Sequence, residues 1–178
     1  MIYFLRHGQS QANVDKIFAG PHYPAPLTTT GRDQATEAGE WIKASGIVID
    51  SIVTSPIERA KITAAIVASV IGFEQSDIIY DSRLVEYDMG ALSGTPMGVT
   101  PQQLISAKGA EDPYKFKARI QECLEDIRKD PGNTLIVSHA GVGRMIEAIR
   151  LGFDPKDFYE LEGYPNARVV DINSGQLI

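Results

Sequence analysis

Two arginines and two histidines stand where short apolar runs give way to polar turns. They are Arg6 and His7, after residues 2–5; Arg59, after residues 52–54; and His139, after residues 134–137. Histidine can act as a nucleophile or exchange protons near neutral pH, and the arginine guanidinium forms bidentate contacts with oxyanions. If the runs are neighbouring strands, the four side chains share one pocket. Such a pocket would bind a small anion, most simply a phosphoryl group.

The elements that must position these side chains alternate along the chain. Short β-branched or aromatic runs occupy residues 2–5, 52–54, 78–80, 134–137 and 167–172, and helical spacing of apolar residues marks residues 30–45, 57–71, 113–129 and 140–152. This alternation predicts an α/β fold, a three-layer α/β/α sandwich with a mostly parallel central sheet. The carboxyl ends of parallel strands form the ligand-binding edge of such sheets, which is where the arginines and histidines would meet.

Two helix starts bear on this pocket. Ser55-Pro56-Ile57-Glu58 has a hydroxyl, then a proline, then a glutamate, which predicts a capping box with Pro56 at the first helical position and a helix that ends at Gly72. The helix that begins near Ala140 would direct backbone N–H groups and the positive end of its dipole toward an anion.

Residues 88–113 are rich in Gly, Pro, Ser and Thr, with room for one short helix after Thr100. Long irregular segments in compact domains are often functional, so we expect a loop or small lid after the third strand. The 178 residues otherwise form a single domain, residues 1–178.

Composition excludes several classes of protein. The formal charge is −6, which disfavours nucleic acid and anionic membranes as partners because both require a basic face. No stretch approaches the roughly 18 apolar residues of a membrane span. The single cysteine, Cys123, cannot form an internal disulfide, and we expect a cytoplasmic protein.

Beyond these local patterns, the chain resembles the histidine phosphatase superfamily, which includes the cofactor-dependent phosphoglycerate mutases. The resemblance opens with Arg6-His7-Gly8-Gln9-Ser10 and Asn13. It continues, in order, through Gly20, Leu27-Thr28, Gly31, Gln34-Ala35, Thr54-Ser55-Pro56, Arg59-Ala60, Glu86, Gly90-Ala91-Leu92, Gly94, Ser138-His139, Gly141-Val142 and Arg144. These elements span nearly the whole chain.

The resemblance implies a role for each matching residue. His7 would be the nucleophile and form a phosphohistidine, with its other ring nitrogen held by a hydrogen bond. Arg6, Arg59 and His139 would bind the phosphoryl oxygens. Asn13 and a backbone amide near Ala140 would assist them.

Glu86 would protonate the leaving alkoxide and then accept a proton from the water that attacks the phosphohistidine. Because the two steps need opposite protonation states, we expect a mildly acidic optimum. Asn166 matches an asparagine that often closes the phosphate side of the site in this family, and a purely structural role for it stays equally open.

The departures from the family pattern favour a phosphatase. The mutases carry an insertion with several arginines after the acid, whereas no Arg or Lys lies between Asp88 and Lys108 here. Water should therefore capture the phosphohistidine, making the chain a phosphomonoesterase for a small phosphorylated metabolite, with no cofactor. A mutase-type phosphotransferase, a non-catalytic phosphate-binding module and transfer to another acceptor stay open.

We expect no metal site. His22, His7 and His139 could in principle supply three ligands, but no paired-histidine motif on a helix supports this. The substrate alcohol and the oligomeric state are not specified by these patterns, and a homodimer is one of the options.

Overall fold

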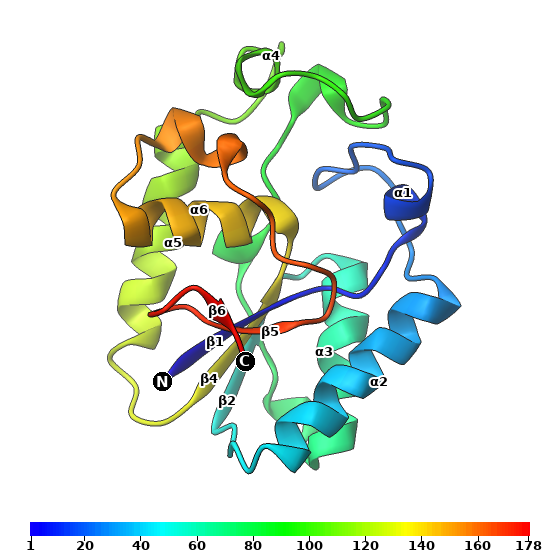
Figure 1. The fold of residues 1–178 in the computed structure, drawn as a ribbon, viewed down its shortest axis with the longest axis vertical. Helices are drawn as coiled ribbons and strands as arrows, with labels where there is room; N and C mark the ends of the chain where they lie inside the picture. The colour runs from blue at the N-terminus through cyan, green and yellow to red at the C-terminus, as the bar shows by residue number, and fades with distance from the viewer.

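The computed structural model describes residues 1–178 as a central sheet covered by helices on both faces (Figure 1). The strands are β1 (Ile2–Arg6), β2 (Ser51–Thr54), β3 (Ile79–Tyr80), β4 (Thr134–Ser138), β5 (Val169–Asp171) and β6 (Gln176–Leu177). Their order across the sheet is β3-β2-β4-β1-β5-β6. The first four are parallel, while β5 and β6 are antiparallel, so the prediction of a mostly parallel sheet is confirmed and β6 was not predicted.

The helices are α1 (Gln11–Val14), α2 (Thr29–Ala44), α3 (Glu58–Ile71), α4 (Pro101–Ile105), α5 (Pro113–Ile127) and α6 (Ala140–Leu151). Alternate residues of β1 show which helices cover which face. Phe4 packs in the core with α5 and α6, whereas Tyr3 and Leu5 pack in the core with α2 and α3. This alternation is the period-two pattern of a strand buried on both faces, and it confirms the three predicted layers.

The start of α3 differs from the prediction. The helix begins at Glu58 and its N-cap residue is Ile57, so Pro56 precedes the helix and no side chain caps it. The Ser55 hydroxyl accepts a hydrogen bond from the Ile57 N–H at 3.2 Å and also lies 2.8 Å from His139 Nε2. The capping box was therefore wrong, because Ser55 is engaged at the strand edge by a histidine that is distant in sequence.

The segment after the third strand is a lid attached to the loop that follows α1. It contains a 3₁₀ turn, Gly90–Leu92, and α4, and in Figure 1 it crosses the end of the molecule farthest from the N-terminus. Backbone hydrogen bonds join Met97 to Lys16 at 2.7 Å and Gly94 to Phe18 at 2.7 Å. None of the helices is both long and apolar enough to cross a membrane.

Candidate active site

The loops that leave β1 and β4 lie side by side at one edge of the sheet. Arg6 pairs with Ser138 in the parallel register, and the His7 N–H donates to the Ser138 carbonyl at 2.8 Å. A cavity of about 230 Å³ opens at this edge. The predicted residues that line it are Arg6, His7, Asn13, Arg59, Glu86 and Ala140. His139 is fully buried directly beside it, with its ring centroid 5.3 Å from that of His7.

The ring of His7 is held in one tautomer. Nδ1 lies 2.7 Å from the Gly8 carbonyl, which can only accept, so the proton is assigned to Nδ1. Nε2 then carries the lone pair, and Arg59 Nε donates to it at 3.1 Å. Burial, and next the charges of Arg59 and Arg6, hold the pKa of His7 well below its usual value. His7 is therefore neutral at physiological pH, and its Nε2 lone pair has the form that a nucleophile requires.

Close backbone packing fixes the loop that carries His7. A Cβ atom on Gly8 would lie 2.0 Å from the Gly31 carbonyl oxygen in the first turn of α2, so only glycine fits. The Gly8 N–H donates to Thr63 Oγ1 at 3.1 Å, and Thr63 Oγ1 donates to the Arg59 carbonyl at 2.8 Å. These contacts fix the position of the His7 loop relative to the helix that bears Arg59.

Hydrogen bonds to backbone carbonyls hold the two predicted arginines, of which Arg59 is buried and Arg6 partly buried. Arg59 donates from Nη2 to the Gly20 carbonyl at 2.9 Å, and Arg6 donates from Nη1 to the Tyr164 carbonyl at 3.1 Å. Burial lowers the pKa of both guanidinium groups, while the carboxylate of Glu86 raises it. Since arginine stays protonated in proteins, the cavity is strongly cationic.

Two buried side-chain nitrogen atoms have no hydrogen-bond partner, and both belong to this site. They are Arg6 Nε and His139 Nδ1. Burial, followed by the charge of Arg59, holds the pKa of His139 well below its usual value. Because buried polar atoms are normally paired, unpartnered nitrogens beside a cationic cavity indicate a place for the oxygen atoms of a bound anion.

Asn13 is oriented to donate into the cavity. Its Oδ1 accepts from the Ser10 N–H at 3.0 Å and from Asn166 Nδ2 at 3.2 Å. The side-chain amide nitrogen makes no bond within the chain and is therefore the group available to a ligand.

Glu86 occupies part of the position expected for an anion at the start of α6. The Gly141 N–H donates to its two carboxylate oxygens at 3.0 and 3.2 Å, and the Tyr87 N–H donates to Oε1 at 2.8 Å. A Cβ atom at Gly141 would lie 2.3 Å from Oε1. A backbone amide near Ala140 was predicted to bind the phosphoryl group. In the structure this helix end serves in part another purpose, because its Gly141 N–H orients the Glu86 carboxylate, which shares the cavity with His7.

Comparison with known proteins agrees with this geometry. The profile of the histidine phosphatase superfamily (branch 1) matches residues 2–176. The chain belongs to the histidine phosphatase superfamily. The resemblance noted from the motifs, and the fold expected from it, are thereby confirmed.

Named relatives include phosphatases and mutases. A broad-specificity phosphatase of Saccharomyces cerevisiae is 32% identical over 158 residues, which cover 82% of this chain and 67% of the yeast protein. A 2,3-bisphosphoglycerate-dependent phosphoglycerate mutase of Parvibaculum lavamentivorans is 42% identical over 94 residues, 53% of this chain and 44% of the mutase. The match to that mutase therefore spans less than half of its length.

Solved structures share the fold. The YhfR protein of Bacillus stearothermophilus superposes with a TM-score of 0.80 at 24% identity, covering 99% of this chain and 93% of that one. A mycobacterial glucosyl-3-phosphoglycerate phosphatase superposes with a TM-score of 0.76 at 24% identity, covering 94% and 90% of the two chains.

Arg144 is a residue of this histidine phosphatase whose place in the site was not predicted. It lines the cavity, one helical turn after Ala140, and the spacing of four residues was the available signal. Its Nε donates to the Leu161 carbonyl at 2.9 Å, and its guanidinium lies 4.6 Å from the ring centre of Tyr159. Neither Nη atom makes a hydrogen bond within the chain.

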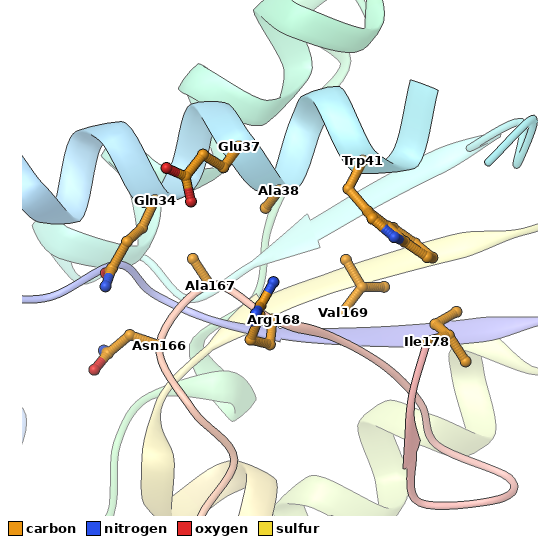
Figure 2. A pocket seen from close by; sticks show the side chains of 9 residues that line it. All are labelled: Gln34, Glu37, Ala38, Trp41, Asn166, Ala167, Arg168, Val169 and Ile178. Atoms are coloured by element: carbon orange, nitrogen blue, oxygen red, sulfur yellow. The ribbon is translucent and has the colours of Figure 1, made fainter. Parts of the chain in front are cut away.

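Asn166 holds the loop that carries His7 through a hydrogen bond to its backbone. Its Nδ2 donates to the His7 carbonyl at 2.7 Å, and Gln34 Oε1 accepts from the Gln9 N–H at 2.8 Å. Figure 2 shows both residues at one end of a second pocket, of about 200 Å³, between α2 and the segment that leads into β5. The structure thus shows a positioning contact for Asn166, the role that the sequence left open.

Apolar side chains from the segment after the third strand reach the cavity. Met89 and Met97 from the lid line the cavity together with Ile17 and Phe18, giving one wall an apolar character. His22 lies 3.5 Å from Asp88 and is largely exposed. No three His, Cys, Asp or Glu side chains are grouped as the ligands of a metal ion would be.

Proposed function

We propose that this histidine phosphatase hydrolyses the phosphomonoester of a small metabolite through a phosphohistidine on His7 Nε2. The observation that carries the proposal is the state of that ring. Nδ1 is bonded to the Gly8 carbonyl, and the neutral Nε2 faces Arg59 in the cavity that also holds the Glu86 carboxyl group.

In the first step, the Nε2 lone pair attacks phosphorus and the bond from phosphorus to the alcohol oxygen breaks. The alkoxide takes a proton from Glu86, which must enter this step protonated. Arg59 Nε transfers its hydrogen bond from His7 to a phosphoryl oxygen. Arg6, Arg59 and His139 then stabilise the charge that spreads over the phosphoryl oxygens.

In the second step, water attacks phosphorus on the opposite side from His7. Glu86 accepts its proton, the bond from phosphorus to Nε2 breaks and inorganic phosphate leaves. No lysine or arginine lies between Asp88 and Lys108 to retain a phosphorylated intermediate. This supports hydrolysis over mutase-type transfer.

The walls of the cavity favour a compact substrate with a second acidic group. Arg144 keeps both Nη atoms free, so it can bind a carboxylate or a second phosphate of the substrate. The names of several relatives include phosphoglycerate. We therefore extend the proposal to carboxylated phosphoesters as preferred substrates.

We propose further that the reaction needs no metal or cofactor. We also propose that the protein is cytoplasmic. Side chains of this chain make every proton transfer and charge contact in the two proposed steps. The cytoplasmic location rests on the composition, with Cys123 as the single cysteine.

The test is phosphate release from p-nitrophenyl phosphate at about pH 6, the mildly acidic range expected from the two opposite proton transfers, in excess EDTA. We expect activity in the wild type, none in His7→Ala, and an acid-labile phosphoryl adduct on His7 in quenched reactions. Loss of activity in EDTA that a divalent ion restores would overturn metal independence. In a parallel reaction with 3-phosphoglycerate as substrate, 2-phosphoglycerate as the main product would indicate a mutase. Binding of phosphate without turnover of either substrate would indicate a binding module.

A further inference from the structure

We propose that Arg119 is a positioning residue that holds Glu86 in register for proton transfer, acting from outside the cavity. The inference rests on the proposed function of Glu86. Arg119 lies on α5, and it is absent from the residues that line the cavity with His7.

The guanidinium of Arg119 binds the backbone that carries Glu86. Nη1 donates to the carbonyl oxygens of Arg83 and Val85 at 2.5 and 2.8 Å, and Nη2 donates to the Glu86 carbonyl at 3.3 Å. No other donor of the chain bonds to these three carbonyls. Residues 85–89 belong to no helix or strand, so Arg119 replaces the hydrogen bonds that regular structure would supply.

Glu111 holds the guanidinium in turn. Its carboxylate oxygens accept from Arg119 Nε at 2.7 Å and Nη2 at 2.9 Å, and both side chains are about four-fifths buried. The Arg119 guanidinium also lies 4.5 Å from the ring centre of Phe116. A bidentate, stacked guanidinium has a single orientation, which a lysine at this position could not reproduce.

Glu111 also holds the residues on the C-terminal side of Glu86. Tyr87 Oη donates to the Glu111 carbonyl at 2.5 Å, and the Glu111 N–H donates to the Asp88 carbonyl at 2.8 Å. The backbone of Glu86 is thus fixed by α5 and Glu111, while its carboxylate is held by the Gly141 N–H of α6. The position of the carboxylate in the cavity therefore depends on both sets of contacts, those of the Glu86 backbone and the hydrogen bond from the Gly141 N–H.

Proton transfer is sensitive to this kind of placement, because the acid must be within hydrogen-bond reach of the leaving oxygen. A displaced acid harms the departure of a poor leaving group such as an alkoxide. It matters much less for p-nitrophenolate, which leaves without full protonation. Leaving-group dependence therefore separates a positioning role from a general loss of stability.

The experiment compares kcat/KM for glycerol 3-phosphate and p-nitrophenyl phosphate, since kcat/KM reports the step that forms the phosphohistidine. In Arg119→Met we expect a fall of about 100-fold for glycerol 3-phosphate, the scale of general-acid catalysis, and less than about 10-fold for p-nitrophenyl phosphate. Arg119→Lys and Glu111→Gln should show the same selectivity with smaller losses. If Arg119→Met does not fold, these two variants allow the same comparison of substrates in a folded protein.

Two further variants sharpen the result. Arg83→Met is the matched control, because Arg83 lies on the same segment and pairs with Asp81 and Asp126 but donates to none of the three carbonyls. It should leave the ratio of the two kcat/KM values unchanged. Glu86→Gln combined with Arg119→Met should lose little more than Glu86→Gln alone, because both changes disable the same proton transfer.

Equal losses on both substrates, or losses that multiply in the double variant, would overturn the positioning role. A wild type that hydrolyses neither substrate would contradict the proposed function itself. The two failures are thereby distinguishable.

Discussion

Arg59 Nε donates a hydrogen bond to His7 Nε2 at 3.1 Å, so the guanidinium of Arg59 occupies the lone pair of that ring nitrogen. The contact orients the ring, and the positive charge of Arg59 contributes to the low pKa of His7. In the proposed mechanism this contact breaks when the ligand binds, because the same lone pair attacks phosphorus. Arg59 would then couple the arrival of an anion to the release of His7 Nε2.

The first prediction concerns this coupling. Arg59→Met should lower kcat/KM by about 100-fold to 1000-fold, the usual effect of removing a donor to a developing oxyanion. The loss of the nearby positive charge should also raise the pKa of His7. In the pH profile for the rate of phosphohistidine formation, the acidic limb, where the rate falls on acidification, should then move to higher pH. Steady-state rates and rapid-quench adduct yields across pH would measure both. Arg32→Met, at an exposed position on α2, is the control, and an unshifted acidic limb in Arg59→Met would contradict the coupling.

The second prediction concerns stability against acid. His7 and His139 are buried with pKa values held below the ordinary one, mainly by burial, so the unfolded chain binds more protons once the pH falls below about 6.5. The free energy of unfolding should therefore decrease on acidification, by up to about 1.4 kcal/mol per pH unit for each histidine. Carboxylates with lowered pKa values, such as Asp81, lose their contribution only near and below about pH 4.

Urea unfolding between about pH 6.5 and pH 4.5 isolates the histidine window. His139→Gln should show a shallower dependence on pH than the wild type. His22→Gln, which replaces an exposed histidine, should keep the wild-type slope. Parallel curves for the wild type and His139→Gln would refute the assignment.

The third prediction concerns the contact between α6 and the acid. In Gly141→Ala the added Cβ, 2.3 Å from Glu86 Oε1, must displace the carboxylate. We expect kcat/KM for glycerol 3-phosphate to fall by about 100-fold, the scale of a lost general acid. Inorganic phosphate should still bind, because Arg6 and Arg59 are untouched. Calorimetric titration with phosphate checks this, and wild-type turnover in Gly141→Ala would exclude the displacement.

The fourth prediction concerns substrate choice. Arg144→Met should lower the preference for 3-phosphoglycerate over glycerol 3-phosphate by about 10-fold to 100-fold, the value of a hydrogen bond to a charged group. The two substrates differ in one carboxylate, so the ratio of their kcat/KM values isolates that contact. Arg150→Met serves as control, because Arg150 lies on the same helix and pairs with Glu147. An unchanged ratio in Arg144→Met would remove the carboxylate from the proposed substrate.

The sequence by itself determined the alternation of strands and helices, because apolar periodicity and helix-ending glycines act over a few residues. The left-handed Gly72 and Gly152 end α3 and α6 as predicted. It also indicated which side chains meet at the sheet edge, since parallel strands bring their carboxyl ends together. Arg6, His7 and Arg59 line one cavity for that reason, whereas Glu86 was expected there from the family resemblance alone.

Contacts between distant segments were decided only by the tertiary structure. Ser55 binds His139 instead of capping α3, Arg119 holds the backbone of Glu86, and Asn166 holds the carbonyl of His7. Each contact joins residues more than thirty positions apart, and packing of helices on the sheet sets its geometry. Local patterns carry no information about that packing, because they describe one element at a time.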